Sequence, residues 1–583
     1  MSDQDAPQAN KSAQEVLSPE DIESHPLIQA LLNKNLINGG QVADLVEAHQ
    51  STHDPLDKLL VDKHIISEEQ LGPFLATQMD IPFIDLKTFI IEPEVLATLP
   101  EALARKYNLV PLFRIKDSLT LAMVDPLNVP AIEEVQKVTG CVVDTMLANR
   151  SSLLQCLDQH YGTGDSMEEL VEITQELDDG ENEEGFDASD VQKMTDDPPL
   201  IRLVNLLLLQ AIDQKASDIH IEPTEKNVRV RFRLDGILHE AKTLPKNIQF
   251  PVTARLKIMS EMDTIERRKP QDGRISIRVR DRGVDLRVST FPTGLGEKIV
   301  MRILDKSGGV PKLTDLGFQE DVLETFNQLI KRPNGIILVT GPTGSGKTST
   351  LYSALDAINT VEINIMTLED PVEAAIPGLN QGQVNPKVGM TFSAGLRSIL
   401  RQDPNVVLVG EIRDDETAEI AIRASLTGHL VFSTLHTNDA PSAITRLIDI
   451  GVKPYLVSSS VLGILAQRLV RKVCVKCAKK GPPDEKLCRL LGIDPKKEFS
   501  GEVPIAKGCE ECHQTGYKGR MGLMELFVPD EKSRRAIVDG VDDTRLKADA
   551  VERLEMKTLK MDGIEKVRLG FTTLSEVLTA TSD

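Results

Sequence analysis

The 583-residue sequence contains no tryptophan, and aromatic residues make up only 3% of it. No apolar run approaches the ~18 to 20 residues that a helix needs to span a bilayer. The segment from Met1 to Lys11 has neither the basic region nor the apolar core of a secretory signal. These absences argue against an integral membrane protein and predict a cytoplasmic one.

Basic residues are also fewer than acidic ones: the sequence has 67 Lys and Arg residues and 89 Asp and Glu residues, which gives a net charge of −22. The excess is uneven: the segment from Thr163 to Asp197 holds fourteen acidic residues and one Lys. Such a composition predicts a disordered linker. An acidic protein without a basic, aromatic-studded groove is not expected to bind nucleic acid.

A chain of this length predicts three or more domains. Short strands (Leu109–Phe113, Leu119–Met123) and the helical stretch Val129–Thr139 indicate a small α/β module. The predicted order is a flexible tail at 1–20, a helical duplicated module at 21–80, the α/β module at 81–162, the acidic linker at 163–197, a strand-rich domain at 198–305, and a domain of alternating strands and helices at 306–583.

The duplicated module repeats its apolar positions 29 residues apart, with helical spacing in each copy. Ser67 and Gln70 predict a capping box in the second copy. The matched positions are Leu27, Leu31, Leu36, Ile37, Gln41, Val42 and Val46 in the first copy, and Leu56, Leu60, Ile65, Ile66, Gln70, Leu71 and Leu75 in the second.

The strand-rich domain opens with a predicted helix, Leu200–Gln214. Apolar and Arg residues then alternate from Val228 to Leu234, which predicts a strand ending at an Asp235-Gly236 turn. A second hairpin is predicted from Ile275–Arg280 and Val284–Ser289, with its turn at Arg282-Gly283.

The segment GPTGSGKTS satisfies the phosphate-loop pattern, in which glycines let backbone N–H groups close around phosphates. Lys347 would reach the outer phosphates, and Thr348 would ligate magnesium. A buried strand, Ile336–Val339, precedes the segment, and a helix from Thr348 to Ile358 follows it, which favours anions at the helix start. The nucleotide-binding residues predicted here are Gly341, Pro342, Thr343, Gly344, Ser345, Gly346, Lys347, Thr348 and Ser349.

Three more strands should place polar residues at the same sheet edge, where ligands bind in parallel sheets. Val406–Val409 leads to Glu411, which would bind magnesium or polarise the attacking water. Ile363–Leu368 leads to Glu369, and the strand from His429 to Leu435 leads to His436. A lone histidine is more often structural, but two that flank one strand suggest a sensor of the γ-phosphate.

Arg274, Arg278, Arg280 and Arg287 lie on the strand-rich domain, ahead of the phosphate loop. Each could simply belong to a solvated sheet face. Phosphoryl transfer nevertheless needs positive charge at the reacting phosphate, and an arginine from a neighbouring subunit accelerates it by ~10³ to 10⁵. That role would require a ring of subunits.

Two CxxC pairs, Cys474 with Cys477 and Cys509 with Cys512, have the pattern of a four-thiolate structural zinc site. The 31 residues between the pairs exceed the common spacing, so reduced structural thiols are the alternative. The remaining cysteines have no partner motif and are expected to be buried or incidental: Cys141, Cys156 and Cys488.

From residue 198 onward these motifs resemble the ATPase family that powers type II secretion and type IV pilus assembly. The resemblance rests on ASDIHIEP (216–223), the phosphate loop, TLEDPVE (367–373), DPNVVLVGEIRD (403–414) and GHLVFSTLHTNDA (428–440). It implies a multidomain α/β protein: a PAS-like α+β domain at 198–305, then a RecA-like ATPase domain with a zinc subdomain at 470–522 and a helical C-terminus.

The resemblance also implies a homohexamer with ATP, Mg²⁺ and Zn²⁺, peripheral at the inner membrane through a platform protein. By matching positions, it assigns Arg274 and Arg287 to the nucleotide. In relatives that bind cyclic di-GMP, each N-terminal repeat opens with Arg-Leu-Gly. Here the repeats open Pro26-Leu27-Ile28 and Pro55-Leu56-Asp57, so we expect no cyclic di-GMP binding.

Two other functions remain open from the sequence. One is a nucleic-acid translocase, such as a DNA-uptake motor, with a zinc ribbon; the net negative charge argues against it. The other is a regulator that binds nucleotide without turnover, against which stand intact Lys347, Thr348 and Glu411. The motifs do not choose between pilus assembly and protein secretion.

Overall fold

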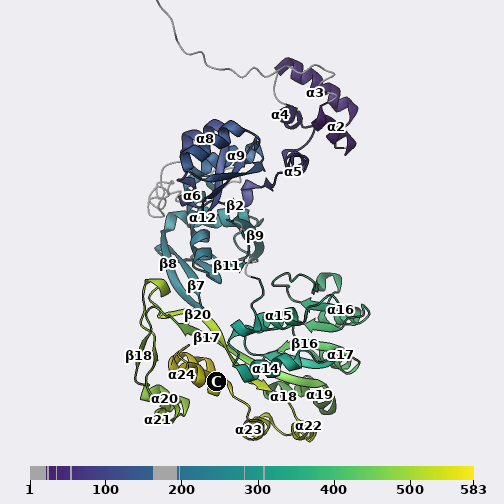
Figure 1. Cartoon of the computed structure of the whole chain (residues 1–583), viewed down its shortest axis with the longest axis vertical. Helices are drawn as coiled ribbons and strands as arrows, with labels where there is room; N and C mark the ends of the chain where they lie inside the picture. Colours follow the sequence, from purple (N-terminus) through teal and green to yellow (C-terminus); the bar gives the residue numbers. More distant parts are fainter. Residues whose placement is uncertain are drawn as a thin grey trace, which may run out of the picture. The chain divides into compact units, whose positions relative to one another are not determined.

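The computed structural model describes residues 25–34, 36–52, 56–161, 197–280, 282–305 and 309–582, together with residues 22, 194 and 195. The chain forms two compact units, Met1–Asp305 and Lys306–Asp583 (Figure 1). The predicted tail at 1–20 and nearly all of the predicted linker at 163–197 lie outside the described residues. Within the described ranges, no helix is long and apolar enough to cross a bilayer.

The first unit begins with four helices, two from each copy of the repeat. The predicted capping box at Ser67 is wrong, because Ser67 makes no side-chain cap and the Gln70 N–H donates to the Ser67 carbonyl instead. The first copy has one: the Asn38 N–H donates to Gln41 Oε1 at 2.9 Å, and the Gln41 N–H donates to Asn38 Oδ1 at 3.1 Å. The helices are α2 (Pro26–Asn33), α3 (Gly39–Thr52), α4 (Leu56–Asp62) and α5 (Glu68–Met79).

The α/β module that follows is built on a four-stranded sheet of order β1-β5-β4-β3. The two predicted strands and the predicted helix are confirmed as β3, β4 and α8. The elements are β1 (Phe83–Ile84), η1 (Leu86–Thr88), β2 (Phe89–Ile90), α6 (Pro93–Leu96), α7 (Glu101–Tyr107), β3 (Leu109–Ile115), β4 (Ser118–Met123), α8 (Val129–Thr139), β5 (Val142–Ala148) and α9 (Arg150–His160).

A seven-stranded sheet of order β2-β9-β10-β11-β6-β7-β8 forms the rest of the first unit. The apolar faces of its strands share one core with α12 and α13, and the period-two alternation from Val228 to Leu234 is confirmed in β7. The elements are α12 (Pro198–Asp213), β6 (Asp218–Pro223), β7 (Asn227–Leu234), β8 (Ile237–Pro245), η2 (Lys246–Ile248), α13 (Gln249–Met259), β9 (Gln271–Val279), β10 (Arg282–Thr293) and β11 (Gly296–Asp305).

The second hairpin turns earlier than predicted. Arg282 already belongs to β10 and pairs with Val279 of β9, so the turn does not lie at Arg282-Gly283. Arg280 takes the left-handed conformation instead, with φ +57°. Positive φ is common in the tight turns that join hairpin strands.

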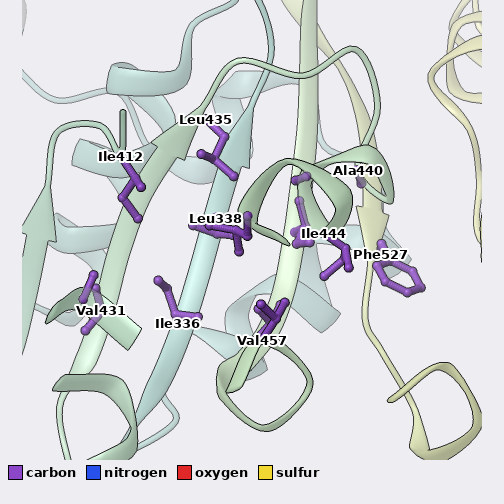
Figure 2. Packing of buried hydrophobic residues seen from close by; sticks show 14 of the residues in the cluster. Ile336, Leu338, Ile412, Val431, Leu435, Ala440, Ile444, Val457 and Phe527 are labelled. Atoms are coloured by element: carbon purple, nitrogen blue, oxygen red, sulfur yellow. The ribbon is translucent and has the colours of Figure 1, made fainter. Parts of the chain in front are cut away.

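The second unit is a seven-stranded sheet of order β14-β13-β15-β16-β12-β17-β20, parallel except for β20, which pairs antiparallel with β17. Along β12, Ile336 and Leu338 enter one core while Ile337 and Val339 enter the core on the other face. Figure 2 shows the first of these cores, with side chains of β12 meeting Val431 and Ile444. Burial on both faces is typical of parallel sheets, and it explains the continuous apolar runs in the sequence.

The sheet strands alternate with helices. They are η3 (Leu313–Leu316), α14 (Glu320–Leu329), β12 (Gly335–Thr340), α15 (Lys347–Ile358), β13 (Ile365–Glu369), β14 (Asn380–Gln383), η4 (Pro386–Val388), α16 (Phe392–Ile399), β15 (Val406–Val409), α17 (Asp415–Leu426), β16 (Leu430–Leu435), α18 (Ser442–Asp449), α19 (Pro454–Ser460), β17 (Val461–Val473) and β20 (Tyr517–Phe527).

A small subdomain lies between β17 and β20, and helices end the chain. The subdomain contains β18 (Lys479–Gly481), α20 (Glu485–Leu491), α21 (Pro495–Glu498), β19 (Val503–Ile505) and η5 (Glu510–Cys512). The last helices are α22 (Glu531–Val538), α23 (Asp543–Arg553), α24 (Leu559–Arg568) and α25 (Leu574–Thr581).

His160, at the end of α9, makes the stability of the first unit sensitive to pH. Burial, together with the nearby Arg202 guanidinium on α12, lowers the pKa of His160 to about 4. The unfolded chain takes up this proton below its ordinary pKa of ~6.5, so folding loses stability as the pH falls from there towards 4. Between pH 7 and pH 5 the loss is about 2 kcal/mol.

We expect His160→Gln to remove this contribution, because glutamine has no proton to bind. Thermal unfolding of both proteins at pH 7 and pH 5 measures it. The substituted protein should lose less stability at pH 5 than the parent, and equal losses would contradict the prediction.

Candidate functional site

Four parallel strands bring their carboxyl ends to one edge of the second unit's sheet. β12 ends at Thr340 beside Leu435 of β16, and Val409 of β15 pairs with both Ser433 of β16 and Leu368 of β13. The predicted common edge is therefore confirmed. Loops that leave these strands can contribute side chains to a single site.

The loop between β12 and α15 has a backbone that requires glycine. Gly341, Gly344 and Gly346 have φ values of +146°, +81° and +89°. A Cβ on Gly341 would lie 2.4 Å from the carbonyl oxygen of Gln467 on β17, far inside any real contact. The glycines therefore serve both the turn and the close approach of a neighbouring strand.

The loop has the donors that phosphate groups need. The Ser345 side chain is buried, and its Oγ has no hydrogen-bond partner among the described residues. The Lys347 ammonium donates to the carbonyls of Gly341 and Pro342 at 2.8 and 3.0 Å. The first turn of α15 adds unpaired N–H groups, which favour anions, and the exposed Thr348 lies in that turn. These donors fit a nucleotide triphosphate.

Glu411 stands beside this loop in a cluster of nitrogen groups. Its side chain is only 14% exposed, with Arg413 Nη2 at 2.5 Å and His436 Nε2 at 3.7 Å from its carboxylate oxygens. Burial and the nearby Lys347 lower the pKa of His436, although Glu411 opposes the shift. Burial also lowers the pKa of Lys347, although the nearby Glu411 carboxylate acts to raise it. Arg413 was missed from the sequence, although it follows Glu411 by two residues.

Glu369 ends β13 in a fully hydrogen-bonded setting. Its carboxylate is buried and accepts from the Tyr352 hydroxyl, from Thr367 Oγ1 at 2.6 Å and from Gln381 Nε2 at 3.2 Å. Tyr352 lies on α15, so Glu369 ties the helix that follows the phosphate loop to the neighbouring strand. The geometry suits positioning better than proton transfer.

His429 lies away from the cluster. It precedes β16, whereas His436 follows that strand, so the two histidines stand at opposite edges of the sheet. The His429 ring contacts the Ala424 carbonyl at 3.0 Å, and its own carbonyl accepts from the Gly335 N–H at the start of β12. Of these two histidines, His436 is the one that lies near Lys347 of the phosphate loop.

The two candidate arginines are cross-strand neighbours in the first unit. Arg274 of β9 pairs with Arg287 of β10, and Arg287 pairs on its other side with Arg302 of β11. The same row continues to Asp218, which lies 3.2 Å from Arg302 Nε. Arg274 forms an ion pair with Asp285 and is 61% exposed. Arg302 was missed from the sequence, because only strand register shows that it belongs to this row.

Four cysteines converge at the base of the subdomain between β17 and β20. The Sγ atoms of Cys474, Cys477, Cys509 and Cys512 all lie within 4.8 Å of one another, with separations of 3.9, 3.7 and 3.6 Å for three pairs. Tetrahedral zinc with Zn–S bonds of ~2.3 Å requires ~3.8 Å between sulfurs. The geometry therefore fits zinc.

Backbone donors also support thiolates there. The Cys512 sulfur accepts N–H groups from Cys509 and Gly516, each at 3.2 Å, and Cys477 accepts from Gly508 at 3.3 Å. Burial works to raise the pKa of Cys512, but these donors lower it to about 6. The other three cysteines are free and buried, as predicted: Cys141, Cys156 and Cys488.

Comparison with known proteins agrees with these motifs. Residues 193–579 match the family model described as Type II/IV secretion system protein. Residues 79–167, which hold the α/β module, match the MshEN domain.

The chain is 42% identical over 557 residues to the type IV pilus assembly ATPase PilB of Myxococcus xanthus, covering 95% of this chain and 98% of that protein. It is 50% identical over 397 residues to the type II secretion system protein E of Pseudomonas aeruginosa, covering 68% and 78%. The X-ray structure of the ATPase DotB of Yersinia pseudotuberculosis shares the fold, with TM-score 0.50 and 19% identity over 66% of this chain and 94% of that one. The chain belongs to the type II/IV secretion system protein family.

Proposed function

We propose that the protein is an ATPase motor that drives type IV pilus assembly or type II secretion. The observation that carries the proposal is the glycine-dependent phosphate loop with Glu411 presented at the same sheet edge. The names of the similar proteins support the same activity. Both kinds of machine use the same motor chemistry, so we leave both open.

In this proposal the loop residues Gly341 to Ser349 hold the triphosphate through main-chain N–H groups and Lys347. The Thr348 hydroxyl and the Glu411 carboxylate would hold Mg²⁺, which when bound neutralises charge between the outer phosphates. Glu411 accepts the proton of the attacking water, and His436 contacts the terminal phosphate. Arg413 fixes the Glu411 carboxylate, and Glu369 fixes α15 through Tyr352.

The positive charge for the reacting phosphate would come from Arg274 and Arg287, with Arg302 beside them. We propose that they belong to a PAS-like domain and serve the RecA-like ATPase domain of a neighbouring subunit in a homohexamer. Such a ring would act in the cytoplasm, against a platform protein of the inner membrane. The four cysteines would hold one structural Zn²⁺ per chain.

Two substitutions distinguish the role of Glu411 from the role of Lys347. We expect Glu411→Gln to reduce ATP turnover at least ~100-fold, because the proton-accepting carboxylate is lost, while ATP still binds, because the loop and Lys347 are unchanged. Lys347→Ala should abolish turnover and weaken ATP binding, because a phosphate contact is lost. Steady-state phosphate release and nucleotide titration measure the two effects.

Glu419→Gln is the matched control, because Glu419 is exposed on α17 and forms its ion pair with Arg423 in the same helix. It should retain turnover. Appreciable hydrolysis by Glu411→Gln would refute its assigned role, and stimulation of the parent by DNA or RNA would favour the translocase instead.

Mixing of two inactive variants tests whether arginine acts between subunits. Arg287→Ala and Glu411→Gln subunits each lack one part of the site. If Arg287 serves a neighbour, about a quarter of the interfaces in an equal mixture are complete, and ATPase activity returns to that order. A mixture no more active than its components would place Arg287 in its own subunit's site or outside the chemistry.

Removal of one thiolate tests the metal. The purified parent should contain one zinc per chain, and Cys512→Ser should contain far less, because three thiolates bind zinc more weakly than four. Elemental analysis of the protein measures this. Cys141→Ser is the control and should keep its zinc, while a parent with well under one equivalent would exclude the site.

A further inference from the structure

The seven-stranded sheet of the first unit is completed by a strand that belongs to the α/β module. β2 is only two residues long and pairs in parallel with the end of β9, Phe89 with Arg278 and Ile90 with Val279. Without it β9 would be an edge strand with unpaired N–H and C=O groups. The module therefore covers the end of the edge strand β9, at Arg278 and Val279, in the sheet that carries Arg274.

The two residues of β2 point into different cores, as neighbours on a strand must. Phe89 packs in the core of its own module, stacked on Phe113 with ring centroids 6.4 Å apart. Ile90 is 3% exposed and lies in the core beneath α12, among residues of the next domain. One aliphatic side chain thus joins the module to the arginine-bearing sheet.

Charged groups surround this junction on three elements. Arg280, at the tip of the β9–β10 hairpin, lies 2.5 Å from a Glu92 carboxylate oxygen and 3.6 Å from Asp213 at the end of α12. Glu92 follows the end of β2 by two residues, and its side chain is 20% exposed. α9 of the module also packs on α12. The contact is thus both apolar and ionic.

We propose that Ile90 and Glu92 form a latch that docks the α/β module on β9, and that Arg280 acts as a positioning residue for Arg274. Arg274 lies within β9, and Arg280 directly follows the last residue of that strand, Val279. β10 pairs along one side of β9, and β2 pairs with its end on the other side. A partner or ligand that pulls the module away would release the end of this strand. The second half of the proposal rests on the role proposed above for Arg274.

The latch is tested without reference to catalysis. A site-specific protease sequence is placed in the acidic segment after Gly180 of the full chain, and the cleaved protein is run on size exclusion over a dilution series. The two fragments should stay together. Arg280→Ala should weaken their association several-fold, since it removes the ion pair with Glu92 that crosses between the fragments, and Ile90→Glu should separate them.

Ile115→Glu is the matched control, because Ile115 is 53% exposed at the end of β3 in the same module. It should leave the fragments together. Circular dichroism of the separated fragments checks that Ile90→Glu has not unfolded the module. If the module is unfolded, Arg280→Ala tests the latch instead, because Arg280 is 47% exposed. Fragments that part in the unsubstituted protein, or that stay equally tight in Arg280→Ala, overturn the latch.

Turnover of the uncleaved chain tests the positioning step. Arg280→Ala should lower kcat several-fold with little change in KM for ATP, and it should cause no further loss in an Arg274→Ala background. Additive losses would overturn the positioning role and leave the latch intact. If the Arg274→Ala protein hydrolyses ATP at the normal rate, the role proposed for Arg274 is wrong. The fragment experiment still tests the latch in that case.

Discussion

The nucleotide site depends on how closely β17 approaches the loop that follows β12. The Gln467 carbonyl leaves no room for a side chain at Gly341, and Gln467 Oε1 accepts from Thr350 Oγ1 at 2.7 Å. The loop is therefore braced from the neighbouring strand as well as from its own helix. Main-chain donors held in this way are organised before a phosphate arrives, which is what electrostatic stabilisation of a transition state requires.

The same sheet edge sets the electrostatics of the cluster. Lys347, Arg413 and His436 surround the single carboxylate of Glu411, and the lowered pKa values of Lys347 and His436 reflect burial in a crowded, cationic setting. The charge balance of this cluster changes when a polyanion binds. The hydrogen bond from Tyr352 to Glu369 ties α15 to β13 beside this cluster.

Local patterns in the sequence predicted much of this site. The phosphate loop is a continuous segment, and strands such as β15 and β16 are apolar runs that parallel pairing explains, so Glu411 and His436 could be placed from the sequence. Features that depend on register could not. Arg302 joins the arginine row only through cross-strand pairing, and β2 is too short to leave any periodic signal. His429 was grouped with His436 because the two flank one predicted strand, but the two ends of that strand lie at opposite edges of the sheet.

The cysteine cluster has a consequence for how this family can vary. Cys474 and Cys477 follow the last residues of β17, and Cys509 and Cys512 precede β20, so the cluster closes the insert at its neck. The sheet ends at that neck, and Arg471 still pairs with Arg520 just inside it. Lengthening a closed loop adds only slowly to its entropic cost. The loops between 478 and 508 can therefore change in length, whereas the apolar side chains of the insert are held by the core that they share with α24 and α25.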